Sequence, residues 1–152
     1  DVAALKSMDM LQSGYEITPD DLRAALERQN LTIEAGDAVF IHTGWGKLWG
    51  VDNAKYNASC PGIGAPAAEW LAKQNIMLIG SDNFPVEVAP NPDKTISLPV
   101  HQIALVVNGI FLLENMKLDE LAASRTYEFA FAVQPLKIKG GTGSTVAPVA
   151  IR

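Results

Sequence analysis

The chain has 152 residues, 48% of them hydrophobic and 19% charged, with a formal net charge of −5. A chain of this length and apolar content can bury a core and is most simply one domain. The acidic balance, without any run of Lys or Arg, predicts no nucleic-acid partner. The longest apolar run, residues 103–113, is too short to cross a bilayer and contains Asn108 and Gly109, so we expect no membrane span.

The single cysteine, Cys60, excludes an internal disulfide and a cysteine-built zinc site. The chain starts at Asp1, in polar sequence without an initiator methionine, which predicts an upstream portion outside this sequence. We expect a cytoplasmic protein, with the periplasm as the alternative.

The first predicted helix follows Thr18. Threonine is a favoured N-cap, proline suits the first helical position, and acidic residues such as Asp21 stabilise the first turn. The helix is expected to end near Gln29. A buried strand is predicted next, at residues 38–41, and it runs into a Gly-rich stretch that starts with His42.

The middle of the chain predicts one helix and one strand between two long loops. Residues 47–63 contain Gly, Pro, Asn and Asp and are expected to form a surface loop. Pro66 starts a predicted helix that reaches Ala72, and residues 76–80 form a strand. A second, proline-rich loop is expected at residues 83–99.

Gly109 divides an apolar segment into two predicted elements. Residues 100–108 suit a short helix that ends at this glycine in a left-handed conformation. Residues 110–113 then suit a buried strand that ends at Glu114. One further helical turn is expected at residues 118–121.

The C-terminal segment alternates between large apolar and smaller or polar residues. Tyr127, Phe129, Phe131 and Val133 share one face, which predicts a long, half-exposed strand from 126 to about 138. A tight turn is expected at residues 140–144. This turn lacks the following lysine and helix of a phosphate-binding P-loop, so phosphate binding is not expected there.

His101 and Glu114 are the candidate metal ligands. His101 lies at the start of the predicted helix and Glu114 at the end of the strand that follows, so a reversal at Gly109 would bring them together. An imidazole and a carboxylate can bind Zn²⁺ or Mn²⁺, but they fill only two positions. The alternative is that both side chains are simply solvated, and spacing alone favours this second interpretation.

Other polar residues are interpreted as structural. His42 is expected to be a hydrogen-bonded loop residue, and Asp82 is expected to cap a turn. None of Ser59, Ser81 and Ser144 lies in a Gly-x-Ser-x-Gly context, so a serine nucleophile is not expected.

The order of short motifs along nearly the whole chain resembles the C-terminal half of the cyclase-like metal-dependent hydrolases, a family that includes bacterial kynurenine formamidase and isatin hydrolase. The most distinctive motif is a Gly-rich stretch after a Pro-Leu pair. The motifs that carry the resemblance are Gly36-Asp37-Ala38-Val39, Thr43-Gly44-Trp45, Pro61-Gly62-Ile63, Ala68-x-Trp70-Leu71, Gly80-Ser81-Asp82, His101, Gly109-Ile110-x-x-x-Glu114-Asn115, Leu118-Asp119-Glu120-Leu121, Pro135-Leu136 and Gly140-Gly141-Thr142-Gly143-Ser144.

The resemblance implies an α/β fold of the swivelling β/β/α type with a mixed sheet, in which residues 1–152 are the C-terminal part of one hydrolase domain. It implies a Zn or Mn centre that hydrolyses small amides, N-formyl groups or lactams, with His101 and Glu114 as late ligands. Trp45, Trp49 and Phe84 are candidate walls of the substrate site. A homo-oligomer is also expected.

One departure from the family pattern limits what this chain can do alone. The other ligands of the family come from an earlier His-x-Gly-Thr-His-x-Asp motif, and this chain, whose only histidines are His42 and His101, has none. We therefore expect the N-terminal portion of the same enzyme to complete the site and this fragment to be inactive alone. The alternative is a non-catalytic scaffold or binding domain that has lost the metal.

Overall fold

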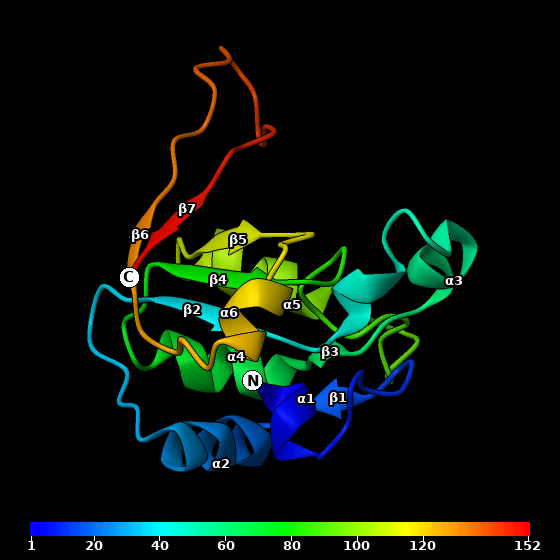
Figure 1. The fold of residues 1–152 in the computed structure, drawn as a ribbon. Coiled ribbons are helices and arrows are strands. Elements are labelled where there is room, and N and C mark those ends of the chain that lie inside the picture. Colours follow the sequence, from blue (N-terminus) through cyan, green and yellow to red (C-terminus); the bar gives the residue numbers. More distant parts are fainter.

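A three-stranded parallel sheet lies at the centre of the computed structural model, which describes all of residues 1–152. Its strands are β2 (Ala38–Ile41), β4 (Leu78–Ser81) and β5 (Phe111–Leu113), in the order β2-β4-β5 (Figure 1). Because all three run in the same direction, their carboxyl ends lie along one edge of the sheet. The predicted α/β class is confirmed.

Two helices have the starts and ends that the sequence predicted. The helix α2 (Pro19–Gln29) begins with a capping box, in which Asp21 N donates to Thr18 Oγ1 and Thr18 N donates to the Asp21 carboxylate. The helix α4 (Ala65–Ala72) carries proline in its first turn. It packs between α2 and the helical segment η2 (Gln102–Val107), and η2 also contacts β5.

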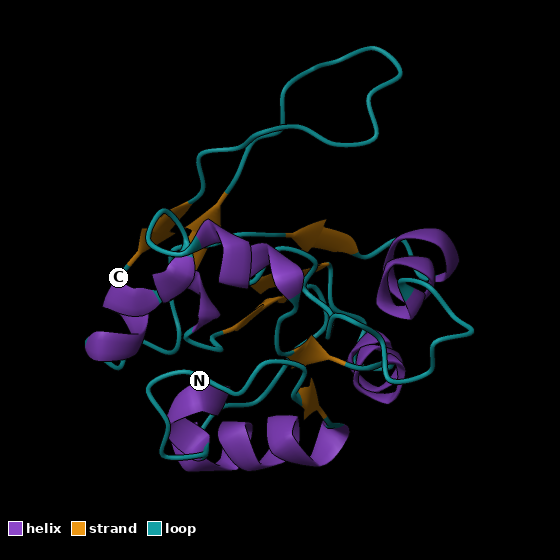
Figure 2. Cartoon of the chain, turned by 90° about the vertical axis from the view of Figure 1, so that its right-hand side faces the viewer, coloured by secondary structure: helices purple, strands orange, loops and turns teal.

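The predicted loop at residues 47–63 is partly wrong, because it contains regular structure. The turn η1 (Trp45–Leu48) is followed by α3 (Asn53–Ala58), where Asp52 accepts a hydrogen bond from Lys55 N. The chain then forms β3 (Gly62–Ile63), which pairs in parallel with β1 (Glu16–Ile17). In the sequence, β1 follows the first helix, α1 (Val2–Leu5). Figure 2 shows that loops of substantial length still connect these short elements.

The predicted helix, reversal and strand around Gly109 are confirmed. The helix α5 (Pro99–His101) continues directly into η2, which has π-helical hydrogen bonding, and Gly109 then adopts a left-handed φ of 66°. After this reversal, the backbone N–H of Ile110 donates a hydrogen bond to the Ala104 carbonyl oxygen at 2.8 Å. The predicted burial of the strand is wrong, because Phe111 is 64% exposed and Leu112 and Leu113 are only half-buried.

The predicted strand at residues 126–138 is much shorter in the structure. Only β6 (Ala130–Ala132) has a partner, the antiparallel β7 (Val149–Ile151), and the residues between them form an arm that extends from the body (Figure 1). The predicted alternation is nevertheless present, since the rings of Phe129 and Phe131 lie 5.5 and 4.6 Å from that of Phe40 on β2. The predicted helical turn is present as α6 (Asp119–Ala123).

The core lies between the sheet and the helices α1, α2 and α4. Gly80, at the centre of the sheet, pairs in register with Phe40, and a Cβ at this position would lie 2.6 Å from the Phe40 ring. The ring therefore occupies the space that a side chain would need. The fully buried members of the core are Val2, Ala3, Leu11, Ile17, Leu22, Ile41, Ile63, Ala67, Ala68, Leu71, Ile76, Ile79, Val86, Val100, Ala104 and Ile110.

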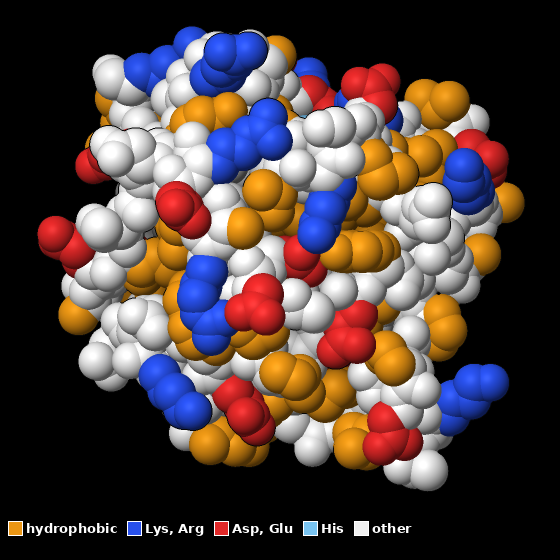
Figure 3. Space-filling model, turned by 90° about the horizontal axis from the view of Figure 1, so that it is seen from below, with side chains coloured by type: hydrophobic (Ala, Val, Ile, Leu, Met, Phe, Trp, Pro, Cys, Tyr) orange, Lys and Arg blue, Asp and Glu red, His pale blue; other side chains and the backbone are white.

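The surface mixes charge types and carries local apolar patches. On the face seen in Figure 3, acidic and basic side chains are interspersed with apolar ones. One apolar patch is formed by Leu105, Val106, Val107 and Phe111 beside the edge strand β5, where each is between 44% and 79% exposed. None of the helices is both long and apolar enough to cross a membrane.

Candidate metal centre

The carboxyl edge of the central sheet collects the polar residues singled out in the sequence. His42 follows β2, Asp82 follows β4 and Glu114 follows β5, so parallel pairing places the three at the same edge. In open α/β sheets, this edge is where ligands usually bind. The fold thus gathers residues that are far apart in the sequence.

His101 and Glu114 lie together, as the predicted reversal at Gly109 required. The Nε2 atom of His101 is 3.3 Å from Oε1 of Glu114. The imidazole is 27% exposed and the carboxylate 45% exposed, so both can be reached from outside. Their role as metal ligands stays a prediction.

The other nitrogen of His101 is held by a residue that the sequence reasoning missed. Glu87, which is 1% exposed, lies with Oε1 2.6 Å from His101 Nδ1. The same carboxylate accepts hydrogen bonds from the backbone N–H groups of Val100 and His101, at 3.2 Å each. The only indication of this role in the sequence is a single acidic residue between two apolar ones, Val86 and Val88, both of which are buried in the structure.

Burial also affects the pKa of Glu114. Partial removal from water raises the pKa of its carboxyl, and the nearby His101 ring opposes this shift. The same imidazole lies beside two carboxylates, Glu87 on one side and Glu114 on the other. A cation placed between Glu114 and Nε2 would stabilise the ionised carboxylate.

This chain brings together two side chains of types that can bind metals, but not a complete site. No group of three or more His, Cys, Asp or Glu residues is arranged to hold a metal ion. The exposed imidazole nitrogen and the carboxylate oxygen are nevertheless donors that Zn²⁺ and Mn²⁺ accept, and the imidazole is oriented through its second nitrogen, as in many metal sites. The pair therefore fits half of such a site.

The predicted wall residues Trp45, Trp49 and Phe84 surround Tyr56 near this edge. Trp45 is 1% exposed and donates its indole N–H to the Tyr56 carbonyl, so its side chain serves packing. Trp49, 56% exposed, and Phe84 each contact the Tyr56 ring, at centroid distances of 5.3 and 5.9 Å. Tyr56 donates its hydroxyl proton to Asn115 Oδ1 at 2.8 Å, which links the cluster to the residue after Glu114.

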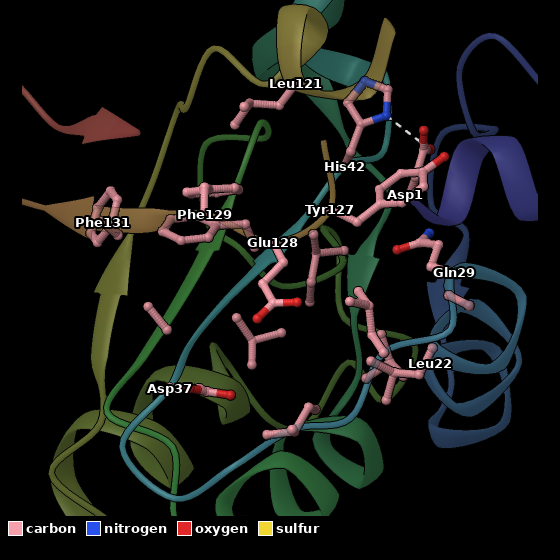
Figure 4. Close-up of a pocket in the computed structure, with 18 of the residues that line it drawn as sticks. Asp1, Leu22, Gln29, Asp37, His42, Leu121, Tyr127, Glu128, Phe129 and Phe131 are labelled. Atoms are coloured by element: carbon pink, nitrogen blue, oxygen red, sulfur yellow. Dashed lines mark hydrogen bonds and ion pairs between the residues drawn. The ribbon is translucent and has the colours of Figure 1, made fainter. Parts of the chain in front are cut away.

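His42 and Asp82 form a separate buried group. His42 Nδ1 is 2.9 Å from Asp1 Oδ1, an interaction visible in Figure 4, while burial lowers the pKa of the imidazole. Asp82 Oδ1 accepts from the Thr43 N–H at 2.9 Å and from the Thr43 hydroxyl at 2.6 Å. The contact with Asp1 agrees with the hydrogen-bonded structural role predicted for His42. The predicted capping of the following turn by Asp82 is wrong, because its carboxylate accepts from residues that follow β2 instead.

A large hollow opens beside β2, which is the other edge strand of the sheet. Its volume is about 750 Å³, and it lies between α2, β2 and residues 126–133 (Figure 4). Most of its lining is apolar, including Leu22, Val39 and Phe129. Parallel sheets are normally covered on both faces by other elements, so an open hollow of this kind is unusual beside one.

Comparisons with known proteins identify relatives along most of the chain. Residues 2–88, more than half of it, match the profile of the family described as "Putative cyclase". Isatin hydrolase from Roseibium aggregatum is 30% identical over 136 residues, which cover 86% of this chain and 51% of that protein.

Solved structures share the fold. The crystal structure of a protein described as a novel cyclase superposes with a TM-score of 0.88 at 32% identity, over 100% of this chain and 51% of that chain. The structure of an isatin hydrolase bound to the product analogue thioisatinate superposes with a TM-score of 0.77 at 28% identity, over 91% of this chain and 53% of that chain. This chain thus spans about half the length of the relatives it matches. The match to more than half of the chain and the shared fold show that the chain belongs to the cyclase family.

Proposed function

We propose that this chain is the C-terminal part of a metal-dependent hydrolase domain that cleaves small amides, N-formyl groups or lactams. The observation that carries the proposal is the convergence of His101 Nε2 and Glu114 Oε1, 3.3 Å apart at the carboxyl edge of the sheet. The names of relatives support the reaction class, since one is an isatin hydrolase. Two structures that share the fold, at 20% and 24% identity, are described as a "potential" and a "predicted" metal-dependent hydrolase.

In this proposal, His101 and Glu114 hold a divalent metal, Zn or Mn. A bound metal would lower the pKa of a water molecule and polarise the carbonyl under attack. The residues of this chain position those two donors: the helical start fixes His101, and the end of β5 fixes Glu114. Trp49 and Phe84 are the proposed walls for a flat substrate. Both contact the ring of Tyr56, which is hydrogen-bonded to Asn115, the residue after Glu114.

The remaining ligands are proposed to come from the N-terminal portion of the same enzyme. About half of each relative has no counterpart in this chain. The apolar hollow beside β2 offers a place for that portion, because a strand added there would cover the lining and extend the sheet. The exposed patch beside β5 and the projecting arm offer further surface for a second copy in a homo-oligomer.

Metal analysis tests the proposal. The protein that contains this chain is expected to bind Zn²⁺ or Mn²⁺, and calorimetric titration should show that Glu114→Ala weakens binding at least tenfold. Glu69→Ala removes an exposed carboxylate on α4 and serves as the matched control, with unchanged affinity. Hydrolysis of isatin and of N-formyl amides by the intact protein should fall with the same variant. Absence of bound metal together with unchanged behaviour of Glu114→Ala would favour the non-catalytic scaffold.

A further inference from the structure

The His101 imidazole has two ring nitrogens with different surroundings. Nδ1 faces the buried carboxylate of Glu87 at 2.6 Å, whereas Nε2 faces the partly exposed Glu114 at 3.3 Å. A neutral imidazole carries its proton on one nitrogen only, and the other nitrogen keeps the lone pair that a metal needs. Glu87 is the nearer of the two carboxylates, so a neutral ring that donates from Nδ1 to Glu87 leaves the lone pair of Nε2 free to act as a ligand.

We propose that Glu87 is a positioning residue that fixes the proton of His101 on Nδ1 and turns the lone pair of Nε2 toward Glu114. This inference rests on the proposed function, since the orientation matters for a metal held by His101 and Glu114. Glu87 does not touch the metal position itself. It acts through the imidazole, as the outer carboxylates of many histidine metal sites do.

The surroundings of Glu87 leave it little choice of position. Its carboxylate is 1% exposed and accepts from Val100 N and His101 N, at 3.2 Å each, in addition to facing the ring. These two amide groups belong to the start of α5, so the same carboxylate ties down the backbone that carries the imidazole. With both backbone donors and the ring on one carboxylate, neither the position nor the rotation of His101 is free.

A purely structural role is the competing explanation, because a carboxylate at a helix start stabilises the helix without any influence on a metal. The two roles differ in what they require of Nδ1. A helix cap needs only the backbone N–H groups, whereas a positioning residue must also accept the Nδ1 proton. The tautomer of His101 therefore separates the two explanations, and it can be observed without any metal.

Nitrogen-15 NMR of the metal-free chain provides the test. The chain has two histidines, so His101→Gln assigns both rings. At a pH where the nitrogen-15 shifts show a neutral ring, the wild type should have a protonated Nδ1 and an unprotonated Nε2 for His101. Glu87→Gln keeps one acceptor oxygen and should retain this tautomer. Glu87→Leu should shift His101 toward the opposite tautomer while the His42 signals stay unchanged.

A zinc titration of the same samples completes the test. In the wild type, zinc should change the nitrogen-15 chemical shift of His101 Nε2. Glu87→Leu should bind zinc at least tenfold more weakly, and the zinc affinity of Glu87→Gln should be closer to that of the wild type. A wild-type His101 protonated on Nε2 would overturn the positioning role, and this result needs no variant to fold. Equal zinc affinity of the wild type and Glu87→Leu would overturn it as well. The expected tautomer without any zinc response would instead count against the proposed function and leave the orientation by Glu87 intact.

Discussion

Replacing Asp82 by alanine should destabilise the chain substantially, because this carboxylate joins the carboxyl ends of two neighbouring strands. Asp82 follows β4 and is 1% exposed, and Thr43, which follows β2, is fully buried. The Thr43 backbone N–H and hydroxyl both donate to Asp82 Oδ1, at 2.9 and 2.6 Å. Alanine at position 82 leaves both donors buried without this acceptor.

The size of the effect follows from these two contacts. A hydrogen bond to a charged acceptor contributes about 1.5–3 kcal/mol, and a buried donor that loses its acceptor costs about 1–3 kcal/mol. Removing the carboxylate also removes the cost of burying it, which offsets part of the loss. We expect Asp82→Ala to lower the free energy of unfolding by about 2–4 kcal/mol. Asp82→Asn keeps an oxygen for Thr43 and should cost about 1 kcal/mol.

Urea denaturation followed by tryptophan fluorescence measures both variants, with Trp45 as a probe close to Thr43. Glu69→Ala, on an exposed face of α4, should stay within about 0.5 kcal/mol of the wild type and serves as the control. If Asp82→Ala changed the free energy of unfolding by less than about 1 kcal/mol, the idea that Asp82 joins the two strand ends would be refuted. Equal losses in the alanine and asparagine variants would refute the role assigned to the retained oxygen.

Three further predictions concern the core, a thiol and a helix start. Leu71→Ala should cost about 2–5 kcal/mol of unfolding free energy, because Leu71 is fully buried in the core, and Leu71→Met should cost less than about 1.5 kcal/mol in the same denaturation assay. Burial raises the pKa of the Cys60 thiol to about 12. A disulfide reagent should therefore label the native chain slowly at neutral pH and the unfolded chain rapidly. Immediate labelling of the native chain would contradict this prediction. Burial acts to raise the pKa of Asp21, but hydrogen bonds from Lys6, Thr18 and Tyr15 outweigh it and leave the pKa below its ordinary value. The stability contributed by Asp21 is therefore fully present above the unfolded pKa of about 4 and is lost as the pH falls through the lower folded pKa. Asp21→Asn should be less stable than the wild type near neutrality and should approach the stability of the wild type in acid. A stability difference that does not depend on pH would contradict this prediction.

Features with local causes could be predicted from the sequence. The helix α2 starts and ends where predicted, because Thr18, Pro19 and Asp21 act on one another within a single turn. The proximity of His101 and Glu114 could be predicted for a similar reason, since a single left-handed residue, Gly109, reverses the chain between them. These outcomes depend on few residues, all close in sequence.

Features that depend on distant partners could not be predicted in the same way. The alternation of residues 126–133 correctly placed Phe129 and Phe131 on one face, but a strand also needs a neighbour, and β7 pairs with only three residues. Glu87 was missed because its partner, His101, lies beyond an irregular, proline-rich loop that has no periodic pattern. The hollow beside β2 likewise depends on what packs there, which no pattern within this chain specifies.

The contact between Gly80 and Phe40 connects the middle of the sheet to the far end of the chain. Gly80 does not have a positive φ, so its backbone could accept other residues, and only the missing space requires glycine. Phe40 in turn supports Phe129 and Phe131 at the base of the projecting arm. A methyl group added at position 80 would clash with the Phe40 ring. The absence of a side chain at position 80 thus leaves room for the ring against which the two aromatic residues at the base of the arm pack.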